Sequence, residues 1–156
     1  MSTPDVRFEK LPPRRVAYMR HIGPYQECGP TFQKFMGYCQ SKGLFKPGVM
    51  IMGVGHDDPA TTPPDQIRYD ACITVDDSFQ PEGEVKVQTL EGGNYAIAAH
   101  VGPYEKMADT YRWFIDTWLP ASGKQMRMLP MFEVYRNSPA DTPPEKLLTE
   151  IHMPLE

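Results

Sequence analysis

The strongest constraint on this chain is an internal duplication. The pentapeptide His-Ile-Gly-Pro-Tyr at 21–25 returns as His-Val-Gly-Pro-Tyr at 100–104, and the Pro-Ala-x-Thr-Pro-Pro stretch at 59–64 returns at 139–144. Two separate motifs that recur in the same order, at nearly the same offset, indicate a tandem repeat of one supersecondary unit. Such a repeat predicts two related halves around an approximate twofold axis, with a ligand-binding groove on that axis.

Each half reads as strand, helix, strand, strand. Short apolar or mixed runs bounded by Pro and Gly predict the strands, and a Pro-rich loop separates the last two strands of each half. The expected strands lie at 15–21, 49–56 and 67–75, then at 95–100, 129–136 and 147–155, with one more at 85–90 that leads into the second half. The sequence therefore predicts an α+β fold of duplicated β-α-β-β units with pseudo-twofold symmetry, in which two helices lie on one face of a curved antiparallel sheet.

Periodicity predicts how these elements are buried. In 67–75 apolar residues alternate with polar ones, which predicts a strand with one buried and one solvated face. Helical spacing follows each Gly-Pro turn, and we expect each helix to bury its apolar stripe against a sheet. The matching stripe residues are Phe32, Phe35, Met36 and Cys39 in the first half and Tyr111, Phe114, Ile115 and Trp118 in the second.

Length and charge bound the class of protein. The 156 residues suit a single domain over 1–156, with repeat 1 at about 5–76, a linker at about 77–84 and repeat 2 at about 85–156. The chain carries 16 Lys and Arg against 20 Asp and Glu, a net charge of −4 with no basic block, so we expect no direct binding of nucleic acid. Neither a membrane-length apolar run nor a signal peptide is evident, which favours a cytoplasmic protein without a membrane partner.

Familiar catalytic and metal-binding motifs are absent. The sequence holds no G-x-S-x-G, H-E-x-x-H, P-loop or G-x-G-x-x-G pattern, and its three cysteines lack zinc-ligand spacing. His21 and His100 occupy equivalent turns, so a geometric role in the turn explains both, and His56 and His152 receive no chemical role. We therefore expect no catalytic residue, no metal and no cofactor.

Glu133 is the polar residue that stands out. It lies between large apolar residues in an expected strand, where a buried carboxylate is costly unless it has a partner. At the offset that aligns the two Pro-rich loops, its counterpart is Gly53, so one half brings a charge where the other brings open space. A single carboxylate among aromatic and Met walls would suit an amphipathic cation. A solvent-facing Glu133 fits the residue pattern equally well.

These motifs together resemble the GyrI-like, or bacterial effector-binding, domain family. The resemblance rests on the two His-x-Gly-Pro-Tyr turns, the strand at 67–70, the entry to the second repeat at 92–96, and above all Pro-Met-Phe-Glu-Val-Tyr at 130–135 followed by the Pro-rich loop and 148–151. It spans nearly the whole chain. It implies a central groove between the two helices, and it assigns Glu133 as the cation-facing residue of that groove.

The aromatic wall is assigned from position in the repeats. We expect Tyr69, Tyr135, Tyr111 and Trp113 to accompany Glu133 as ligand-binding residues. Trp113 stands where the first repeat has Lys34, so it lies off the shared stripe, and both a groove-facing and an exposed position fit. The family includes drug-sensing modules of bacterial transcription activators, but this chain shows no helix-turn-helix domain.

The leading hypothesis is a protein that binds hydrophobic, cationic small molecules as a drug sink or as a sensor subunit, rather than an enzyme. A sensor would need a separate DNA-binding regulator as its partner. The family also implies two alternatives: an interaction protein that restrains DNA gyrase, and a hydrolase of strained electrophilic compounds. In the latter, Glu133 would orient or deprotonate water.

Overall fold

The computed structural model describes residues 3–156 and divides the chain into two compact units. We call Pro12–Gly92 the N unit, and the chain up to Leu11 together with Gly93–Glu156 the C unit. Each unit contains an antiparallel sheet with helix on one face, in the order strand, helix, strand, strand. The predicted α+β class and the duplicated β-α-β-β unit are thereby confirmed.

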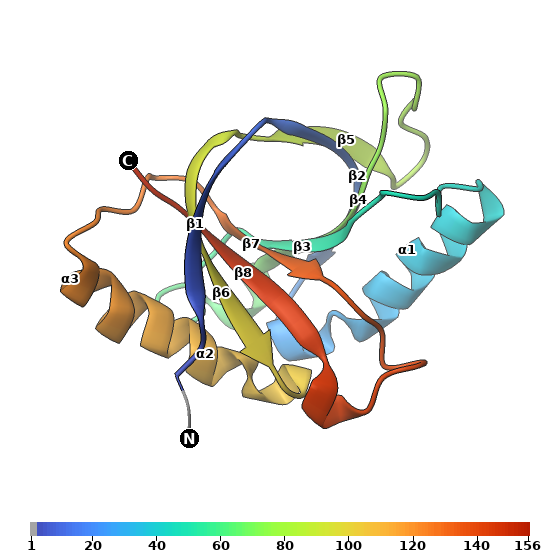
Figure 1. Ribbon diagram of the computed structural model, residues 1–156. Coiled ribbons are helices and arrows are strands. Elements are labelled where there is room, and N and C mark those ends of the chain that lie inside the picture. The colour runs from blue at the N-terminus through green and yellow to red at the C-terminus, as the bar shows by residue number, and fades with distance from the viewer. Residues whose placement is uncertain (1–2) are drawn as a thin grey trace. The chain divides into compact units, whose positions relative to one another are not determined.

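The N unit places its helix on a four-stranded antiparallel sheet of order β3-β4-β2-β5. Its elements are β2 (Arg14–Ile22), the short 3-10 turn η1 (Tyr25–Glu27), α1 (Gly29–Ser41), β3 (Ile51–Gly55), η2 (Pro64–Gln66), β4 (Arg68–Thr74) and β5 (Lys86–Leu90). Figure 1 shows α1 along one face of these strands.

The C unit repeats this arrangement with the strand order β1-β6-β8-β7. Its elements are β1 (Val6–Leu11), β6 (Gly93–Val101), η3 (Tyr104–Lys106), α2 (Met107–Trp113), the π-helical turn η4 (Phe114–Trp118), α3 (Leu119–Ser122), β7 (Met131–Tyr135), η5 (Pro144–Lys146) and β8 (Leu148–Pro154). The segment from α2 to α3 follows one face of the C-unit sheet (Figure 1).

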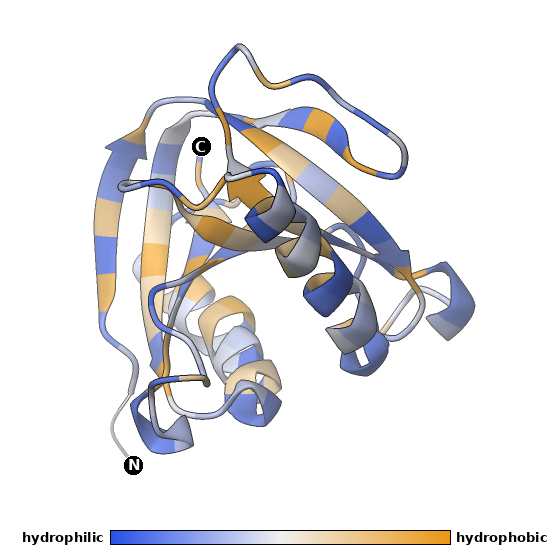
Figure 2. Cartoon of the chain, turned by 90° about the vertical axis from the view of Figure 1, so that its right-hand side faces the viewer, coloured by the Kyte–Doolittle hydropathy of each residue, from blue (hydrophilic) through white to orange (hydrophobic). Residues whose placement is uncertain are grey.

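The edge strands pair across the repeat boundary. β1, which precedes the first repeat's helix, pairs with β6 of the C unit, whereas β5, which precedes the second repeat's helix, pairs with β2 of the N unit. The sequence pattern did not predict β1. Hydrophobic and hydrophilic residues alternate along it (Figure 2). Three of its four central residues are charged, so the run carries little apolar signal, and all four are exposed in the structure.

The repeated His-x-Gly-Pro-Tyr motif forms the same turn in both units. Nε2 of His21 donates to the carbonyl oxygen of Pro24, and Nε2 of His100 donates to that of Pro103, each over 3.0 Å. The intervening glycine has φ +140° at Gly23 and φ +142° in the second copy, a conformation that side-chain-bearing residues rarely adopt. The two histidines therefore brace the strand-to-helix turn, as their repetition predicts.

The helical stripes are buried as predicted with one exception. Phe35 and Phe114 are fully buried at the centre of the two cores. Ile115, predicted to share the stripe, is 39% exposed, so that prediction was wrong. The half-buried residue beside it is Trp113, whose ring stacks on Phe114. The helix buries part of Trp113 in preference to Ile115, because burying an indole removes more apolar surface from water than burying an isoleucine side chain.

β4 also differs from the prediction of one solvated face, and its counterpart β8 is buried in the same way. Both faces of each strand are buried, and the polar positions Asp70 and Glu150 are 0% and 6% exposed. Alternation between apolar and polar residue types predicts a solvated face only when the polar side chains lack partners inside the protein. Here ion pairs allow these carboxylates to be buried.

Among the described residues, none of the helices is both long and apolar enough to span a membrane.

Candidate ligand-binding site

Glu133 lies in the middle of β7, on the face of the C-unit sheet that carries the helix. Its neighbour two residues earlier, Met131, belongs to the core under that helix, and residues two apart on a strand share a face. Across the ladder, Glu133 pairs with Ile151 of β8, which is fully buried in the same core. The strand register thus turns Glu133 inward rather than to the outer surface.

Three tyrosines surround this carboxylate. The hydroxyl of Tyr111 on α2 donates a hydrogen bond to Glu133. Burial raises the pKa of the Tyr104 phenol, and the nearby Glu133 charge raises it further. Tyr135 follows two residues along β7, and its ring packs on Tyr104 with centroids 5.9 Å apart. We call Glu133, Tyr104, Tyr111 and Tyr135 the Glu133 cluster.

The surroundings of Glu133 disfavour its charged form, because burial desolvates the carboxylate. Burial raises its pKa from 4.5 to about 7, although the hydrogen bond from Tyr111 acts in the opposite direction. Part of its surface remains accessible, and the protein packed densely around it still desolvates the charge. A positive ligand beside Glu133 would favour the ionised form. The arrangement can thus neutralise a cation against tyrosine rings.

The structure brings some of the predicted ligand residues together. Tyr111 and Tyr135 lie with Glu133 in the C unit, as described. Trp113 is half-buried against Phe114 and the helix core. Tyr69 lies in the N unit, 6% exposed, with its ring edge-on to Tyr25 at 6.4 Å. Ligand contacts by these residues stay predictions.

Tyr104 belongs to the cluster, although it is not among the ligand-binding residues expected from the sequence. No signal in the sequence marks it, and the structure distinguishes it by its 40% exposure. Its counterpart Tyr25 has a fixed role, because its hydroxyl donates to the carbonyl oxygen of Asp57 over 2.6 Å. Repetition of a residue type therefore concealed a difference in environment.

The N unit fills the equivalent region differently. At the offset that aligns the two Pro-rich loops, the equivalent pairs are Gly53 and Glu133, Gly55 and Tyr135, and Tyr69 and Thr149. A Cβ added at Gly55 would lie 3.0 Å from the Tyr25 hydroxyl, so the Tyr25 ring occupies the space that a side chain would need. The N unit thus packs this face with tyrosine rings and contributes no carboxylate to it.

A buried ionic cluster lies on the opposite face of the N-unit sheet. Asp70 accepts hydrogen bonds from Arg20 at 2.8 and 3.0 Å, from Gln88 at 2.9 Å and from His56 at 2.6 Å. Burial alone would raise the pKa of Asp70, but these donors outweigh it and hold the pKa at about 2. His56, which received no role from the sequence, is therefore a partner of a buried carboxylate.

The C unit carries a related cluster at Glu150, the counterpart of Asp70. Glu150 accepts from Arg7 of β1 and from Arg136, and both arginines are more exposed than Arg20. Beside it, His152 stacks on Phe132 with ring centroids 4.5 Å apart, and burial lowers the pKa of His152 to about 4. Acidic residues at equivalent positions of the two repeats were a signal for these clusters.

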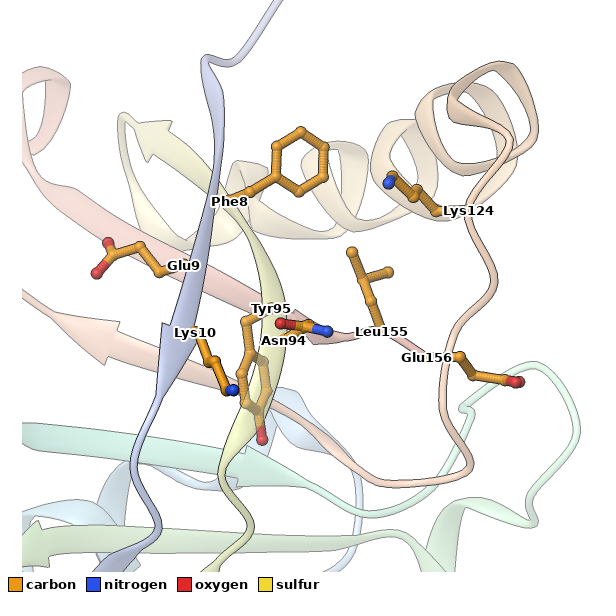
Figure 3. A pocket seen from close by; sticks show the side chains of 8 residues that line it. All are labelled: Phe8, Glu9, Lys10, Asn94, Tyr95, Lys124, Leu155 and Glu156. Atoms are coloured by element: carbon orange, nitrogen blue, oxygen red, sulfur yellow. The ribbon is translucent and has the colours of Figure 1, made fainter.

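A cavity of about 310 Å³ lies in the C unit at the end of β1. Its lining residues are Phe8, Glu9, Lys10, Asn94, Tyr95, Lys124, Leu155 and Glu156 (Figure 3). The Lys124 Nζ lies 5.5 Å from the centre of the Phe8 ring. This lining mixes charges of both signs and does not include Glu133.

Two relatives of known name resemble the chain over most of its length. The "Probable transcriptional regulator YgiV" of Escherichia coli (strain K12) is 33% identical over 156 residues, which cover 98% of this chain and 97% of that protein. The "DNA gyrase inhibitor" of the same organism and strain is 30% identical over 132 residues, which cover 82% of this chain and 83% of that protein.

Solved structures share the fold at lower identity. The C-terminal domain of EcmrR has a TM-score of 0.76 with 19% identity, and the match covers 98% of each chain. A hydrolase from Listeria innocua has a TM-score of 0.65 with 16% identity, covering 100% of this chain and 94% of the other. A protein solved with bound tetraphenylphosphonium has a TM-score of 0.64 with 18% identity, covering 97% and 94%.

The family follows from a match along nearly the whole sequence. The model of the "GyrI-like small molecule binding domain" matches residues 4–156, which agrees with the resemblance carried by the two turns and the segment around Glu133. With this match and a relative that is 33% identical over 98% of the chain, the protein belongs to the family of GyrI-like small molecule binding domains.

Proposed function

We propose that this protein binds hydrophobic, cationic small molecules, with Glu133 as the counter-charge, and that it serves as a drug sink or as the sensor subunit of a separate regulator. The observation that carries the proposal is the inward-facing Glu133, which accepts a hydrogen bond from Tyr111 and has its pKa raised to about 7. Membership in a family of small-molecule binding domains supports the binding of small molecules as the activity.

Desolvation of Glu133 favours a cationic ligand. A carboxylate removed from water gains most from a ligand that supplies a positive charge, because the attraction between opposite charges strengthens as the local dielectric constant falls. Tyr104 and Tyr135, which pack edge-on against each other, would supply aromatic surface to a permanently charged, poorly hydrated cation. A related fold with bound tetraphenylphosphonium supplies the probe.

The test is titration calorimetry with tetraphenylphosphonium and the neutral triphenylphosphine oxide, on the wild type and on Glu133→Gln. The amide preserves the shape and removes the charge. Removing one member of a buried charge pair costs about 2–5 kcal/mol, more than tenfold in affinity. We expect that loss for the cation at pH 8 and little change for the neutral compound. Glu145→Gln, which removes one exposed charge from the same unit, is the control.

Proton linkage gives a second readout from the same titrations. Because the cation selects ionised Glu133, wild-type affinity for tetraphenylphosphonium should fall as the pH drops from 8 to 6, whereas Glu133→Gln should show a flat profile. Equal losses for the charged and neutral compounds would indicate a steric role for Glu133. No loss for either would exclude it from the binding site.

A second candidate function is restraint of DNA gyrase, favoured by the "DNA gyrase inhibitor" relative at 30% identity. A supercoiling assay with purified gyrase separates the two functions. A protein that only binds small molecules leaves supercoiling unchanged at any concentration, and a gyrase inhibitor lowers it in proportion to the amount added. Repeating the assay with Glu133→Gln shows whether ligand binding and inhibition share a site.

A third candidate is hydrolysis of strained electrophiles, favoured by the pKa of Glu133. A carboxyl group with a pKa of about 7 is matched to general-base work near neutral pH, and Tyr111 could donate a proton to a leaving oxygen. Incubation of an epoxide or activated cyclopropane with the protein, followed by product analysis, tests this reaction. Turnover lost in both Glu133→Gln and Tyr111→Phe would support it.

A further inference from the structure

Thr149 lies on β8 on the same sheet face as the Glu133 cluster. It pairs with Tyr135 on one side and with His100 of β6 on the other. Ile151, two residues further along β8, pairs with Glu133. Thr149 is therefore the diagonal neighbour of Glu133 across the ladder, a relation that places the two residues about 7–8 Å apart. One small ligand can span that separation.

The hydroxyl of Thr149 is buried without a hydrogen bond. The residue is 0% exposed, and Oγ1 has no partner among the described residues. His100, its neighbour in the ladder, cannot serve, because Nε2 donates to the carbonyl oxygen of Pro103 and Nδ1 bonds to the hydroxyl of Thr110 at 2.7 Å. Such a group is rare in native proteins and destabilises the fold unless something satisfies it.

The other unit shows that the hydroxyl is not required by the fold. The equivalent of Thr149 is Tyr69, whose ring packs edge-on against Tyr25. In the C unit a small polar residue replaces that ring, and Tyr104 packs on Tyr135 instead. The exchange moves the second ring from the Thr149 position to the Tyr135 position and leaves a hydroxyl on the strand next to Glu133.

We propose that the Thr149 hydroxyl is a polar subsite of the Glu133 site, which accepts a hydrogen bond from the ligand and selects cations bearing an N–H group over cations without one. This inference rests on the proposed function, in that Glu133 must first recognise the positive charge. The preferred ligand class is an aromatic amine or amidine-like cation. Glu133 pairs with the positive charge, the tyrosine rings pack against the apolar body of the ligand, and the Thr149 hydroxyl accepts a hydrogen bond from the N–H group.

Two xanthylium dyes test the subsite. Rhodamine methyl ester with free amino groups and tetramethylrhodamine methyl ester share one cationic skeleton, and only the first has N–H donors. We expect the wild type to bind the amino dye more tightly. Thr149→Val, which replaces the hydroxyl with a methyl group, should weaken the amino dye about fivefold or more and the tetramethyl dye less than about twofold. Thr149→Ser should retain the preference.

The stability of the ligand-free protein is a second readout, in which Thr149→Val should give a gain where dye binding shows a loss. Removing an unsatisfied buried hydroxyl should raise the midpoint of thermal unfolding of Thr149→Val by about 2–4 °C. A variant that is more stable yet loses only the amino dye supports the proposal. Lower stability together with equal losses for both dyes would make Thr149 a packing residue.

Glu133→Gln separates this inference from the proposed function. Both dyes carry the same charge, so loss of Glu133 should weaken them by a similar factor. If the wild type binds neither dye nor tetraphenylphosphonium, the proposed function fails and the subsite with it. If Glu133→Gln weakens both dyes while Thr149→Val leaves the preference unchanged, only the subsite is overturned.

Discussion

The N unit and the C unit share a strand, helix, strand, strand order and an identical turn, yet only the C unit presents a carboxylate on its helix face. The N unit has Gly53 and Tyr69 where the C unit has Glu133 and Thr149. The histidine braces in the two turns have the same 3.0 Å hydrogen bond. Duplication preserved the residues that shape the backbone, and divergence at a few inward-facing positions placed a carboxylate on the helix face of one copy.

The two units also differ in how they stabilise a carboxylate on the opposite sheet face. Asp70 is fully buried and receives four hydrogen bonds from Arg20, His56 and Gln88. Glu150 is held by Arg7 and by another exposed arginine, so water screens its ion pairs more. The same acidic position therefore contributes differently to stability in the two copies.

The largest expected effect is on the two cores. Phe35→Ala and Phe114→Ala should each lower the free energy of unfolding by about 3–5 kcal/mol, because both rings are fully buried. Urea denaturation measures the loss. Phe45→Ala is the control, because the Phe45 side chain is 48% exposed. Similar losses would show that the units depend equally on their helices. A much smaller loss in one variant would show that its unit tolerates a cavity.

Asp70→Asn and Glu150→Gln sharpen the ionic comparison. Removing a charge from a fully buried pair costs about 3–5 kcal/mol, whereas partly exposed pairs contribute about 1 kcal/mol. We expect Asp70→Asn to be the more destabilising at pH 7. The pKa of Asp70 is lowered from 3.8 to about 2, so its contribution is present above pH 3.8 and is lost as the pH falls toward 2. Equal losses in the two variants would contradict the comparison.

Glu133 should give a stability profile of the opposite sign. Its pKa is raised from 4.5 to about 7, so the folded protein holds the proton more tightly than the unfolded chain does. The contribution of Glu133 to stability is then fully present below pH 4.5 and is lost as the pH rises through about 7. Glu133→Gln should stabilise the free protein by about 1–3 kcal/mol at pH 8 and by little at pH 4. Thermal melts at both pH values check this, and a pH-independent effect would contradict it.

The smallest expected difference concerns the helix edges. Met36 is half-buried against the N-unit core, and its counterpart Ile115 is 39% exposed. Met36→Ala should cost about 1–2 kcal/mol and Ile115→Ala less than about 1 kcal/mol, in proportion to the apolar area each removes from water. Urea denaturation midpoints compare the two. A larger loss at Ile115 would mean that the helix is rotated about its axis, with Ile115 toward the sheet.

Much of the candidate site could be predicted because Glu133 breaks both the local apolar pattern and the repeat. Tyr111 and Tyr135 followed from helix spacing and strand spacing. Tyr104 did not, because it stands in the same repeated motif as Tyr25, and the sequence cannot show that the Tyr25 hydroxyl is bonded to Asp57 while Tyr104 is 40% exposed. Thr149 did not either, because a threonine in an apolar strand carries no local sign that its hydroxyl lacks a partner.

The sequence by itself determined the duplication, the repeated turns and the strand, helix, strand, strand order of each copy, and it singled out Glu133 without deciding which way its side chain faces. These depend on local periodicity and on comparison of the chain with itself. Tertiary structure alone decided the exchange of β1 and β5 between repeats, the exposure of Ile115, the burial of Asp70 and the neighbours of Glu133. Each of these depends on which distant segments pair and on how much space their side chains leave, and neither is encoded in the spacing of residues along one strand or helix.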